Sequence, residues 1–391
     1  MGSPLTISVA LPAGFEAAAE TLALGGELKS SICLIRHGTA GLSVAIGDLE
    51  QEDIYRHFLA SAESVLTACK AEQIAIDRHP DYLSTKYGQQ LADELSLPLQ
   101  QVQHHHAHIA AVMADNNLPL DCKSVLGIAL DGLGFGEDGT IWGGEFLLAD
   151  YRGFQRVGRF QPVAMPGGAA AIHEPWRNTL AHLLPLWDTV STTFSDTDII
   201  RFLNNKPVAM MHSMLASGLN APLASSCGRL FDAVAAAVGL YRDRVDCEAQ
   251  AAIALEQAAS ACFDRETARY TYQTCDEHGC LQLNWQPMWL ELLGDIQNGT
   301  DTGVIAARFH RTIIDALHVT AVSLCRTHRI DTIALSGGVF QNRLISIHLP
   351  QALQQDGLSV LQHHQVPTHD GGICLGQAIV AAAIRLKEKV A

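Results

Sequence analysis

Residues 124–136 read Ser-Val-Leu-Gly-Ile-Ala-Leu-Asp-Gly-Leu-Gly-Phe-Gly, and this stretch decides the fold class of the chain. Residues 124–130 form a nearly continuous apolar run, which predicts a buried β-strand. Asp131 and Gly132 follow, so an acidic side chain stands at the carboxyl end of that strand. An isolated buried carboxylate is costly unless it is paired or bound to a cation. Asp131 is therefore a candidate metal ligand, or else a hydrogen-bond partner of the glycine turn that follows it.

Strands and helices alternate on both sides of this strand. Upstream, we expect a strand pair with its turn at residues 37–41, helices at 49–70 and from 104 towards 114, and strands at 73–77 and 97–102. Downstream, we expect two more strands, a mainly helical region at 174–260, a β or mixed insert at 270–285, strands at 332–335 and 358–361, and a closing helix. This interleaving predicts an α/β protein.

The length of the chain predicts two lobes, because 391 residues exceed what one hydrophobic core usually supports. We assign residues 1–160 to lobe I, which is closed by a C-terminal helix at residues 371–391. Residues 161–370 are assigned to lobe II. The sequence contains no Ser/Pro-rich linker, so we expect the lobes to pack closely.

Composition excludes several classes of protein. No segment approaches the roughly 18–20 uninterrupted apolar residues that cross a bilayer, and residues 1–11 lack the basic start of a signal peptide. We therefore expect a cytoplasmic protein without membrane contact, in which the ten cysteines are mostly free core residues. The 26 Lys and Arg against 41 Asp and Glu give a net charge of -15, with no basic run. Nucleic acid is therefore not expected as the main partner.

A cluster of histidines lies at residues 104–108, which read His-His-His-Ala-His. On a helix, His104 and His108 lie about 40° apart, one turn removed, so that their ring nitrogens can converge on one metal ion. His105 and His108 lie about 60° apart, so geometry alone leaves that pair open. His106 points to the opposite side. Although a solvent-facing or core cluster is the plain alternative, four histidines in five residues favour a metal site.

Two carboxylates are candidates to complete this metal site. Asp131 ends the buried strand, and Asp370 precedes Gly371 and Gly372 at the start of the last helix. Asp370 is equally well explained as the N-cap of that helix. A set of two histidines and two aspartates suits iron(II) or zinc and leaves room for a substrate oxygen.

Four glycine-rich loops are candidates for a nucleotide site. Gly132 and Gly134 follow a strand but open no helix, so they do not form a dinucleotide fingerprint. They are similar to the hairpin by which actin-like ATPases place backbone N–H groups against phosphates. A second loop, with Gly337 and Gly338, opens a helix whose N-terminus favours an anion. The third loop contains Gly167 and Gly168, and the fourth contains Gly228. Each loop alone is as well explained by an ordinary turn, but together they favour a nucleotide between the lobes.

Two polar residues accompany these loops. Asn342 lies about one turn into the helix after Gly338, where its amide is suited to a ribose or a phosphate. Asp232 faces the same cleft if its helix begins near Gly228, and a place on the helix surface is equally compatible with the sequence.

Eight stretches together resemble the C-terminal carbamoyltransferase domain of the hydrogenase maturation factor HypF. They read LALGGELK, HPDYLSTKYG, VQHHHAHIAA, ALDGLGFGEDGTIWGGEF, AMPGGAAAIHEPWR, SSCGRLFDAVAA, LSGGVFQNRLI and THDGGICLGQA, and they extend from about residue 22 to 380. The wider family includes the universal tRNA threonylcarbamoyl transferases and antibiotic O-carbamoyltransferases. The resemblance implies a two-lobed actin-like (ASKHA) fold with a nucleotide cleft between the lobes.

The resemblance also implies the site residues. In that family, histidines that match His104 and His108 bind iron or zinc with aspartates that match Asp131 and Asp370, so the resemblance selects His104 over His105. The same analogy places carbamoyl-adenylate, an ATP-derived nucleotide, between the lobes. The residues that it would touch are Gly167, Gly168, Asp232, Gly337 and Gly338, with Asn342 nearby.

The activity that the resemblance implies is a metal-dependent carbamoyl transfer. The acceptor would be the C-terminal cysteine thiolate of a HypE-like partner, and the product would lead to the cyanide ligands of [NiFe] hydrogenase. No serine or cysteine of this chain is needed as a nucleophile. The other candidates are an O-carbamoyltransferase for a small-molecule hydroxyl and a nucleotide-binding scaffold without catalysis; a tRNA-modifying subunit is disfavoured by the acidic charge.

The sequence departs from full-length HypF in two respects. The acylphosphatase-like domain, the paired CxxC zinc motifs and the adenylate-forming domain have no counterpart in this chain, so we do not expect it alone to make carbamoyl-adenylate. The first hairpin carries Arg36, His37 and Gly38 where many actin-like ATPases have an acidic residue. Kinase-type ATP hydrolysis is therefore not expected.

Overall fold

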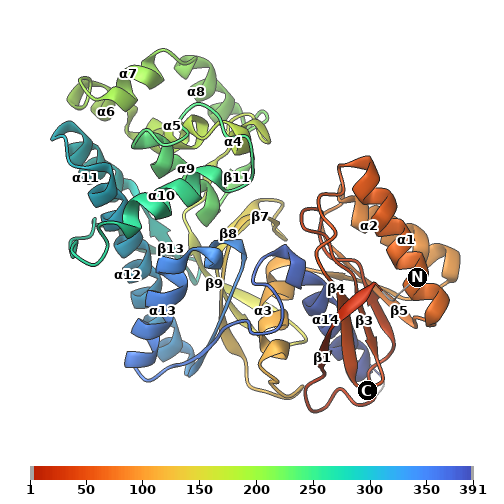
Figure 1. The fold of residues 1–391 in the computed structure, drawn as a ribbon. Helices are drawn as coiled ribbons and strands as arrows, with labels where there is room; N and C mark the ends of the chain where they lie inside the picture. Colours follow the sequence, from red (N-terminus) through yellow and green to blue (C-terminus); the bar gives the residue numbers. More distant parts are fainter. Residues whose placement is uncertain (1–3, 389–391) are drawn as a thin grey trace.

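The computed structural model describes residues 4–388 and contains two β-sheets with helices between and around them (Figure 1). Residues 389–391 of the predicted closing helix lie outside the described residues. The predicted α/β class is confirmed. Within the described part of the chain, no helix is both long enough and apolar enough to span a bilayer.

The first sheet has six strands in the order β1-β4-β3-β2-β5-β6. His37 and Gly38 both have positive φ and form the two-residue turn between β3 and β4. The predicted strand pair is present, but its turn is shorter than the predicted residues 37–41, because β4 begins at Thr39. The bounds are β1 (Leu5–Ala10), β2 (Thr21–Ala23), β3 (Cys33–Arg36), β4 (Thr39–Ser43), β5 (Gln73–Asp77) and β6 (Leu99–Val102). The helices α1 (Glu52–Ala68) and α2 (Leu83–Leu95) share an apolar cluster with Leu22 and Leu24, on one face of this sheet.

The second sheet has the order β12-β13-β9-β8-β7-β14-β15, with the two short strands β10 and β11 beside it. Its central strand β7 pairs antiparallel with β8 and parallel with β14. The bounds are β7 (Val125–Phe135), β8 (Ile141–Ala149), β9 (Phe154–Phe160), β10 (Val163–Ala164), β11 (Leu223–Ala224), β12 (Gln273–Glu277), β13 (Cys280–Asn284), β14 (Thr332–Ser336) and β15 (Ser359–Leu361).

Sheet membership differs from the predicted lobe boundary at residue 160. Strands β7, β8 and β9 hydrogen bond within the sheet of β14 and β15, and not within the sheet of β1–β6. The parallel pairing of β7 with β14 joins residues about two hundred positions apart, for example Ile128 with Leu335, and local sequence patterns carry no information about such pairing. By sheet membership, lobe II therefore includes residues 125–160.

Two helices lie between the sheets and position the candidate site. Helix α3 (His104–Asp115) and helix α14 (Ile373–Glu388) pack against each other, and they share one apolar cluster with Ala23 of the first sheet and Ala129 of the second. Gly376 permits this close packing, because a Cβ atom there would lie 1.8 Å from the carbonyl oxygen of Ala107. Both helices begin at the same end of this layer, so their first residues are brought together.

The far face of the second sheet is covered by the predicted helical region and three later helices. Their apolar side chains form a large cluster with Leu126, Ile128 and Leu130 of β7. The helices are α4 (Ala170–His173), α5 (Trp176–Leu183), α6 (Trp187–Thr193), α7 (Asp198–Asn204), α8 (Val208–Ser217), α9 (Cys227–Ala237), α10 (Gln250–Ser260), α11 (Gln286–Gln297), α12 (Thr302–His328) and α13 (Arg343–Gln355), with short 3₁₀ turns at Leu184–Leu186, Gly338–Gln341 and Asp370–Gly372.

Candidate metal and nucleotide site

The first turn of α3 presents two imidazoles to one point. Gln103 caps the helix, and its side chain accepts a hydrogen bond of 2.8 Å from the backbone N–H of His106. His104 and His108 lie on the same face one turn apart, with ring centroids separated by 5.1 Å. Both side chains are buried, so their ring nitrogens require partners inside the protein.

Two carboxylates lie at the same point. Nε2 of His104 is 3.3 Å from Oδ2 of Asp131, and Nε2 of His108 is 3.6 Å from Oδ1 of Asp370. One ligand atom from each of the four residues lies within 4.8 Å of the ligand atoms of the other three. The structure thus brings together the four residues proposed as metal ligands, which we call the His/Asp cluster.

The contacts of His105, His106 and Asp370 decide between the roles that the sequence left open for them. His106 Nε2 lies 2.7 Å from the backbone oxygen of Asp150, on the side of the helix away from the cluster. His105 Nδ1 lies 3.3 Å from Gln103 Nε2, and His105 is not part of the cluster. Asp370 is the first residue of the 3₁₀ turn Asp370–Gly372 that precedes α14, and His369 is the N-cap of that turn and accepts the N–H of Gly371.

The donor set and its charge fit a divalent cation. Nε2 of His108 is buried without a hydrogen-bond partner among the described residues, although it faces two carboxylates at 3.6 and 3.9 Å. Oδ1 of Asp131 also accepts the backbone N–H of Gly338 at 3.2 Å, rather than that of its own glycine turn. Two imidazoles and two carboxylates are the ligand types that iron(II) and zinc prefer.

A third carboxylate, Asp77, supports the cluster and was missed from the sequence. Its Oδ2 lies 2.9 Å from Nδ1 of His104, and neither side chain is exposed. Burial alone would lower the pKa of His104, but Asp77 and Asp131 outweigh it and hold that pKa well above its usual value. The local field therefore favours a positive charge at His104 Nε2, where a metal ion would replace the proton. The sequence signal was an acid at the end of the predicted strand 73–77.

A cleft of about 690 Å³ opens beside the cluster, and residues of the second sheet and of loops next to the first sheet line it. Asp370 reaches into this cleft, so the His/Asp cluster lies at its wall. Lys29, after β2, pairs with Glu248, before α10, and this ion pair at 2.5 Å joins the two sides. An inner cavity of about 320 Å³ shares Lys29, Asp232 and Glu248 with the cleft. Both volumes are in the usual range of small-molecule sites.

The predicted nucleotide residues are distributed unevenly around these spaces. Gly132, Asp232, Gly338 and Asn342 line the inner cavity, and Gly134 lines the cleft. Gly167, Gly168 and Gly337 are not among the described residues that line either space, so their nucleotide contacts stay a prediction. Asn342, Gly132 and Gly134 differ in detail from the sequence expectation.

Asn342 is the N-cap of α13 and does not lie one turn inside it. Its Oδ1 accepts the N–H of Ile345 at 3.1 Å, and its Nδ2 lies 3.0 Å from His310 Nε2. Gly132 and Gly134 lie inside β7, at an irregularity of its pairing with β8, and the hairpin turn follows at residues 136–140. The predicted hairpin is therefore present, but its glycines lie before the turn.

Arg229 on α9 is a further charged residue of this site that the sequence did not single out. It lines both the cleft and the inner cavity, and its Nη2 pairs with Oδ2 of Asp232 at 2.8 Å. Its Nε and Nη1 atoms are buried and have no hydrogen-bond partner among the described residues. Burial raises the pKa of Asp232, and Arg229 opposes this shift. A guanidinium with unused donors is suited to an anionic ligand.

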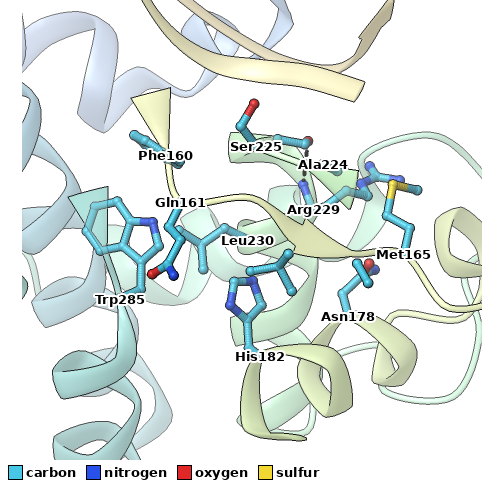
Figure 2. Close-up of a pocket in the computed structure, with 13 residues that line it drawn as sticks. Phe160, Gln161, Met165, Asn178, His182, Ala224, Ser225, Arg229, Leu230 and Trp285 are labelled. Atoms are coloured by element: carbon cyan, nitrogen blue, oxygen red, sulfur yellow. Dashed lines mark hydrogen bonds between the residues drawn. The ribbon is translucent and has the colours of Figure 1, made fainter. Parts of the chain in front are cut away.

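Arg229 also lines a separate small pocket of lobe II (Figure 2). Its volume of about 20 Å³ holds about one water molecule, which excludes a nucleotide. Burial lowers the pKa of His182 to about 3, so this imidazole in the wall is neutral. Nε1 of Trp285 is buried there without a partner in the described part of the chain. A single ordered water fits this pocket better than any substrate.

Two family models match most of the chain. Residues 16–115 match the HypF Kae1-like domain, and residues 127–377 match the second subdomain of the carbamoyltransferase Kae1-like domain. The chain belongs to the HypF family. The boundary between the two matches, at residues 116–126, coincides with the change of sheet between β6 and β7.

Curated relatives and solved structures agree with this assignment. The chain is 37% identical over 375 residues to carbamoyltransferase HypF of Rhodobacter capsulatus, covering 95% of this chain and 48% of that protein. It is also 37% identical over 379 residues to a carbamoyltransferase HypF homolog of Cupriavidus necator, covering 95% of this chain and 93% of that protein. Thus the chain spans about half the length of several HypF relatives and nearly all of one.

The fold matches two crystal structures of HypF. One is full-length HypF in the phosphate- and nucleotide-bound form, with a TM-score of 0.84, 32% identity, and coverage of 96% of this chain and 56% of that one. The other is HypF of T. kodakarensis, with a TM-score of 0.83, 29% identity, and coverage of 97% of this chain and 49% of that one. The predicted two-lobed actin-like fold is confirmed.

Proposed function

We propose that this chain catalyses a metal-dependent carbamoyl transfer from carbamoyl-adenylate to a thiolate. The proposed acceptor is the C-terminal cysteine of a HypE-like protein, in the synthesis of the cyanide ligands of [NiFe] hydrogenase. The observation that carries this proposal is the His/Asp cluster at the wall of a cleft of nucleotide size. Family membership supports the type of reaction, and the nucleotide-bound relative supports the class of donor.

His104, His108, Asp131 and Asp370 would hold iron(II) or zinc, which when bound polarises a carbonyl or anchors a phosphate. Arg229 offers its unused N–H donors to the adenylate phosphate, and Asp232 keeps the guanidinium in place. Gly338 and Val339 of the turn before α13 line the same cavity. The chain thus binds and orients the donor, while the nucleophile comes from the partner.

The reaction balances without a covalent intermediate on this chain. The acceptor sulfur forms a bond to the carbamoyl carbon, the bond from that carbon to the phosphate oxygen breaks, and AMP leaves with the electron pair. Cys227 and Cys374, which belong to the motifs shared with the family, are fully buried. Burial also raises the pKa of the Cys227 thiol, so it is a poor nucleophile.

The test uses the full chain, carbamoyl-adenylate and a peptide that ends in the acceptor cysteine. Mass spectrometry should show a thiocarbamate on the cysteine and release of AMP, and His108→Ala should abolish both. His106→Gln is the matched control, because His106 is on the same helix but faces away from the cluster. Absence of thiocarbamate with the wild-type chain contradicts the proposal. Carbamoylation of a small-molecule hydroxyl instead would favour the O-carbamoyltransferase, and binding without any transfer would favour the scaffold.

A further inference from the structure

A buried row of polar side chains leads away from His108, on the side opposite its free Nε2. Nδ1 of His108 lies 3.2 Å from Oγ of Ser336, and the same oxygen lies 2.9 Å from Nε2 of His363. Nδ1 of His363 faces Oδ2 of Asp115 at 3.5 Å, which is the longest link. Ser336 and the side chain of Asp115 are fully buried, and the side chain of His363 is 6% exposed.

This row begins and ends on α3. Asp115 lies seven residues after His108, and seven residues are close to two helical turns, so both side chains are on one face. Ser336 is the last residue of β14, and His363 follows β15. Asp115 is held in place because its carboxylate accepts the backbone N–H groups of His364 at 2.6 Å and Gln365 at 3.1 Å.

The hydrogen-bond donors and acceptors along this row favour the tautomer of His108 that carries its proton on Nδ1. An imidazole that offers the lone pair of Nε2 to a cation carries its proton on Nδ1. That proton needs an acceptor, and Ser336 Oγ is the atom in reach. The hydroxyl then donates to His363 Nε2, and the proton of His363 lies on Nδ1, facing the carboxylate of Asp115.

We propose that Ser336, His363 and Asp115 form a relay that positions His108 as a metal ligand by fixing its Nδ1-protonated tautomer. This inference rests on the metal site of the proposed function. Nδ1 of His104 contacts the carboxylate of Asp77 directly. Nδ1 of His108 contacts Ser336 instead, and the carboxylate of Asp115 lies beyond Ser336 and His363. Partners of this kind orient ligands, and their loss typically weakens metal binding about 10- to 100-fold.

The row is similar to a Ser-His-Asp nucleophile, but the contacts of Ser336 favour the positioning role. Its side chain is fully buried, and its Oγ is engaged by two imidazoles at once. A nucleophilic serine has to reach a substrate carbonyl. A cavity of about 210 Å³ touches His363 and not Ser336, so a substrate there would meet the imidazole first.

The test measures the zinc affinity of the full chain. Bound metal is first removed, and zinc binding is then measured by competition with a chromophoric chelator. His108→Ala is the reference for a chain that has lost the site. Ser336→Ala and His363→Phe should each weaken binding about 10- to 100-fold. His363→Gln keeps an acceptor for Ser336 and should lose less. His364→Phe is the control, because His364 is exposed on the same loop, and it should bind like the wild type.

A double variant, Ser336→Ala with His363→Phe, separates a relay from two structural defects. If the three residues act as one relay, a second interruption reduces zinc affinity little beyond the first. The double variant should therefore bind zinc about as weakly as the single variant with the lower zinc affinity. Additive losses, or wild-type affinity in both single variants, would overturn the relay. Asp115 is unsuitable for this test, because its substitution also releases the loop backbone.

A second readout needs no metal. ¹⁵N spectra of the histidine-labelled apo chain report the fraction of His108 that is protonated on Nδ1, and Ser336→Ala should lower that fraction below the wild-type value. An equal fraction in Ser336→Ala and in the wild type would overturn the relay. If the wild-type chain binds neither zinc nor iron(II), the proposed metal site fails, and the tautomer still decides the relay separately.

Discussion

Nδ1 of His104 lies 2.9 Å from Oδ2 of Asp77, and both side chains are completely buried. Asp77 ends β5 in the first sheet, whereas Asp131, on the other side of the imidazole, belongs to the second sheet. His104 therefore joins the two sheets at the His/Asp cluster. This contact therefore links the arrangement of the two sheets to the geometry of the His/Asp cluster.

Asp77→Asn should weaken zinc binding about 10-fold, and Asp77→Ala about 100-fold. Asparagine can still accept the Nδ1 proton but carries no charge, whereas alanine leaves that proton without an acceptor. Competition with a chelator measures both values. Asp81→Asn, an exposed acid nearby, should have no effect, and equal affinity of all four proteins would contradict the role of Asp77.

Gly134→Ala should displace the two histidines that pack against it. A Cβ atom at this position would lie 2.3 Å from Cε1 of His105 and 2.8 Å from Cδ2 of His104. Overpacking of this kind typically costs about 1–3 kcal/mol, so both the free energy of unfolding and the zinc content should fall. Urea denaturation and elemental analysis measure them. Gly153→Ala meets no atom within 4 Å and should leave both unchanged; identical behaviour of the two variants would reject this explanation.

Arg229→Met should reduce the affinity for AMP, the leaving group of the proposed reaction, about 10- to 100-fold, since hydrogen bonds to charged groups contribute about 1.5–3 kcal/mol. Methionine keeps much of the volume but removes the N–H donors of a side chain that lines the inner cavity. Isothermal titration calorimetry measures the affinity. Arg242→Met is the matched control, because Arg242 pairs with Asp198 and lines neither space. Wild-type affinity in Arg229→Met would show that AMP binds elsewhere.

Asp115→Asn should lower the free energy of unfolding by about 1–3 kcal/mol near pH 7. Burial alone would raise the pKa of Asp115, but the nearby imidazole of His363 and the hydrogen bonds from the backbone N–H groups of His364 and Gln365 outweigh it and hold that pKa below its usual value. The folded-state pKa is thus lower than the unfolded one, so the stabilisation is present above the usual carboxylate range and is lost as the pH falls through the lowered pKa.

Urea denaturation of metal-free protein at several pH values measures this difference. It should stay constant from about pH 7 to pH 5 and narrow at lower pH. Asp121→Asn, an exposed acid that pairs with Arg152, should differ little from the wild type. If the difference for Asp115→Asn grows towards acid pH, the carboxylate of Asp115 does not stabilise the fold in its ionised form.

Local sequence patterns were sufficient to predict the main helices and strands and the types of side chain in the His/Asp cluster. The strand predicted at residues 73–77 is β5, and the helix that opens at the histidine cluster is α3. A helix has a fixed period, so the convergence of His104 and His108 follows from their spacing alone. The apolar run before Asp131 in the same way predicts the buried strand β7, but this strand continues past Asp131 to Phe135.

Such patterns could not predict contacts between residues that are far apart in the sequence. Asp77 and His104 are 27 positions apart, and His108 and Ser336 are 228 positions apart. Neither contact follows from a periodicity, because each depends on which strands are neighbours in a sheet. The same reason explains the lobe boundary at residue 160, since β7 joins β14 only through the strand order of the second sheet.

The amino-acid sequence by itself thus determined the class of fold, the family resemblance and four side chains suited to a cation. Only the tertiary structure decided that α3, β7 and the start of α14 meet at one point, and that Asp77, Arg229 and Ser336 lie around it. The physical reason is that hydrophobic periodicity and backbone geometry act over a few residues. The packing of two helices between two sheets, by contrast, sets distances between side chains from opposite ends of the chain.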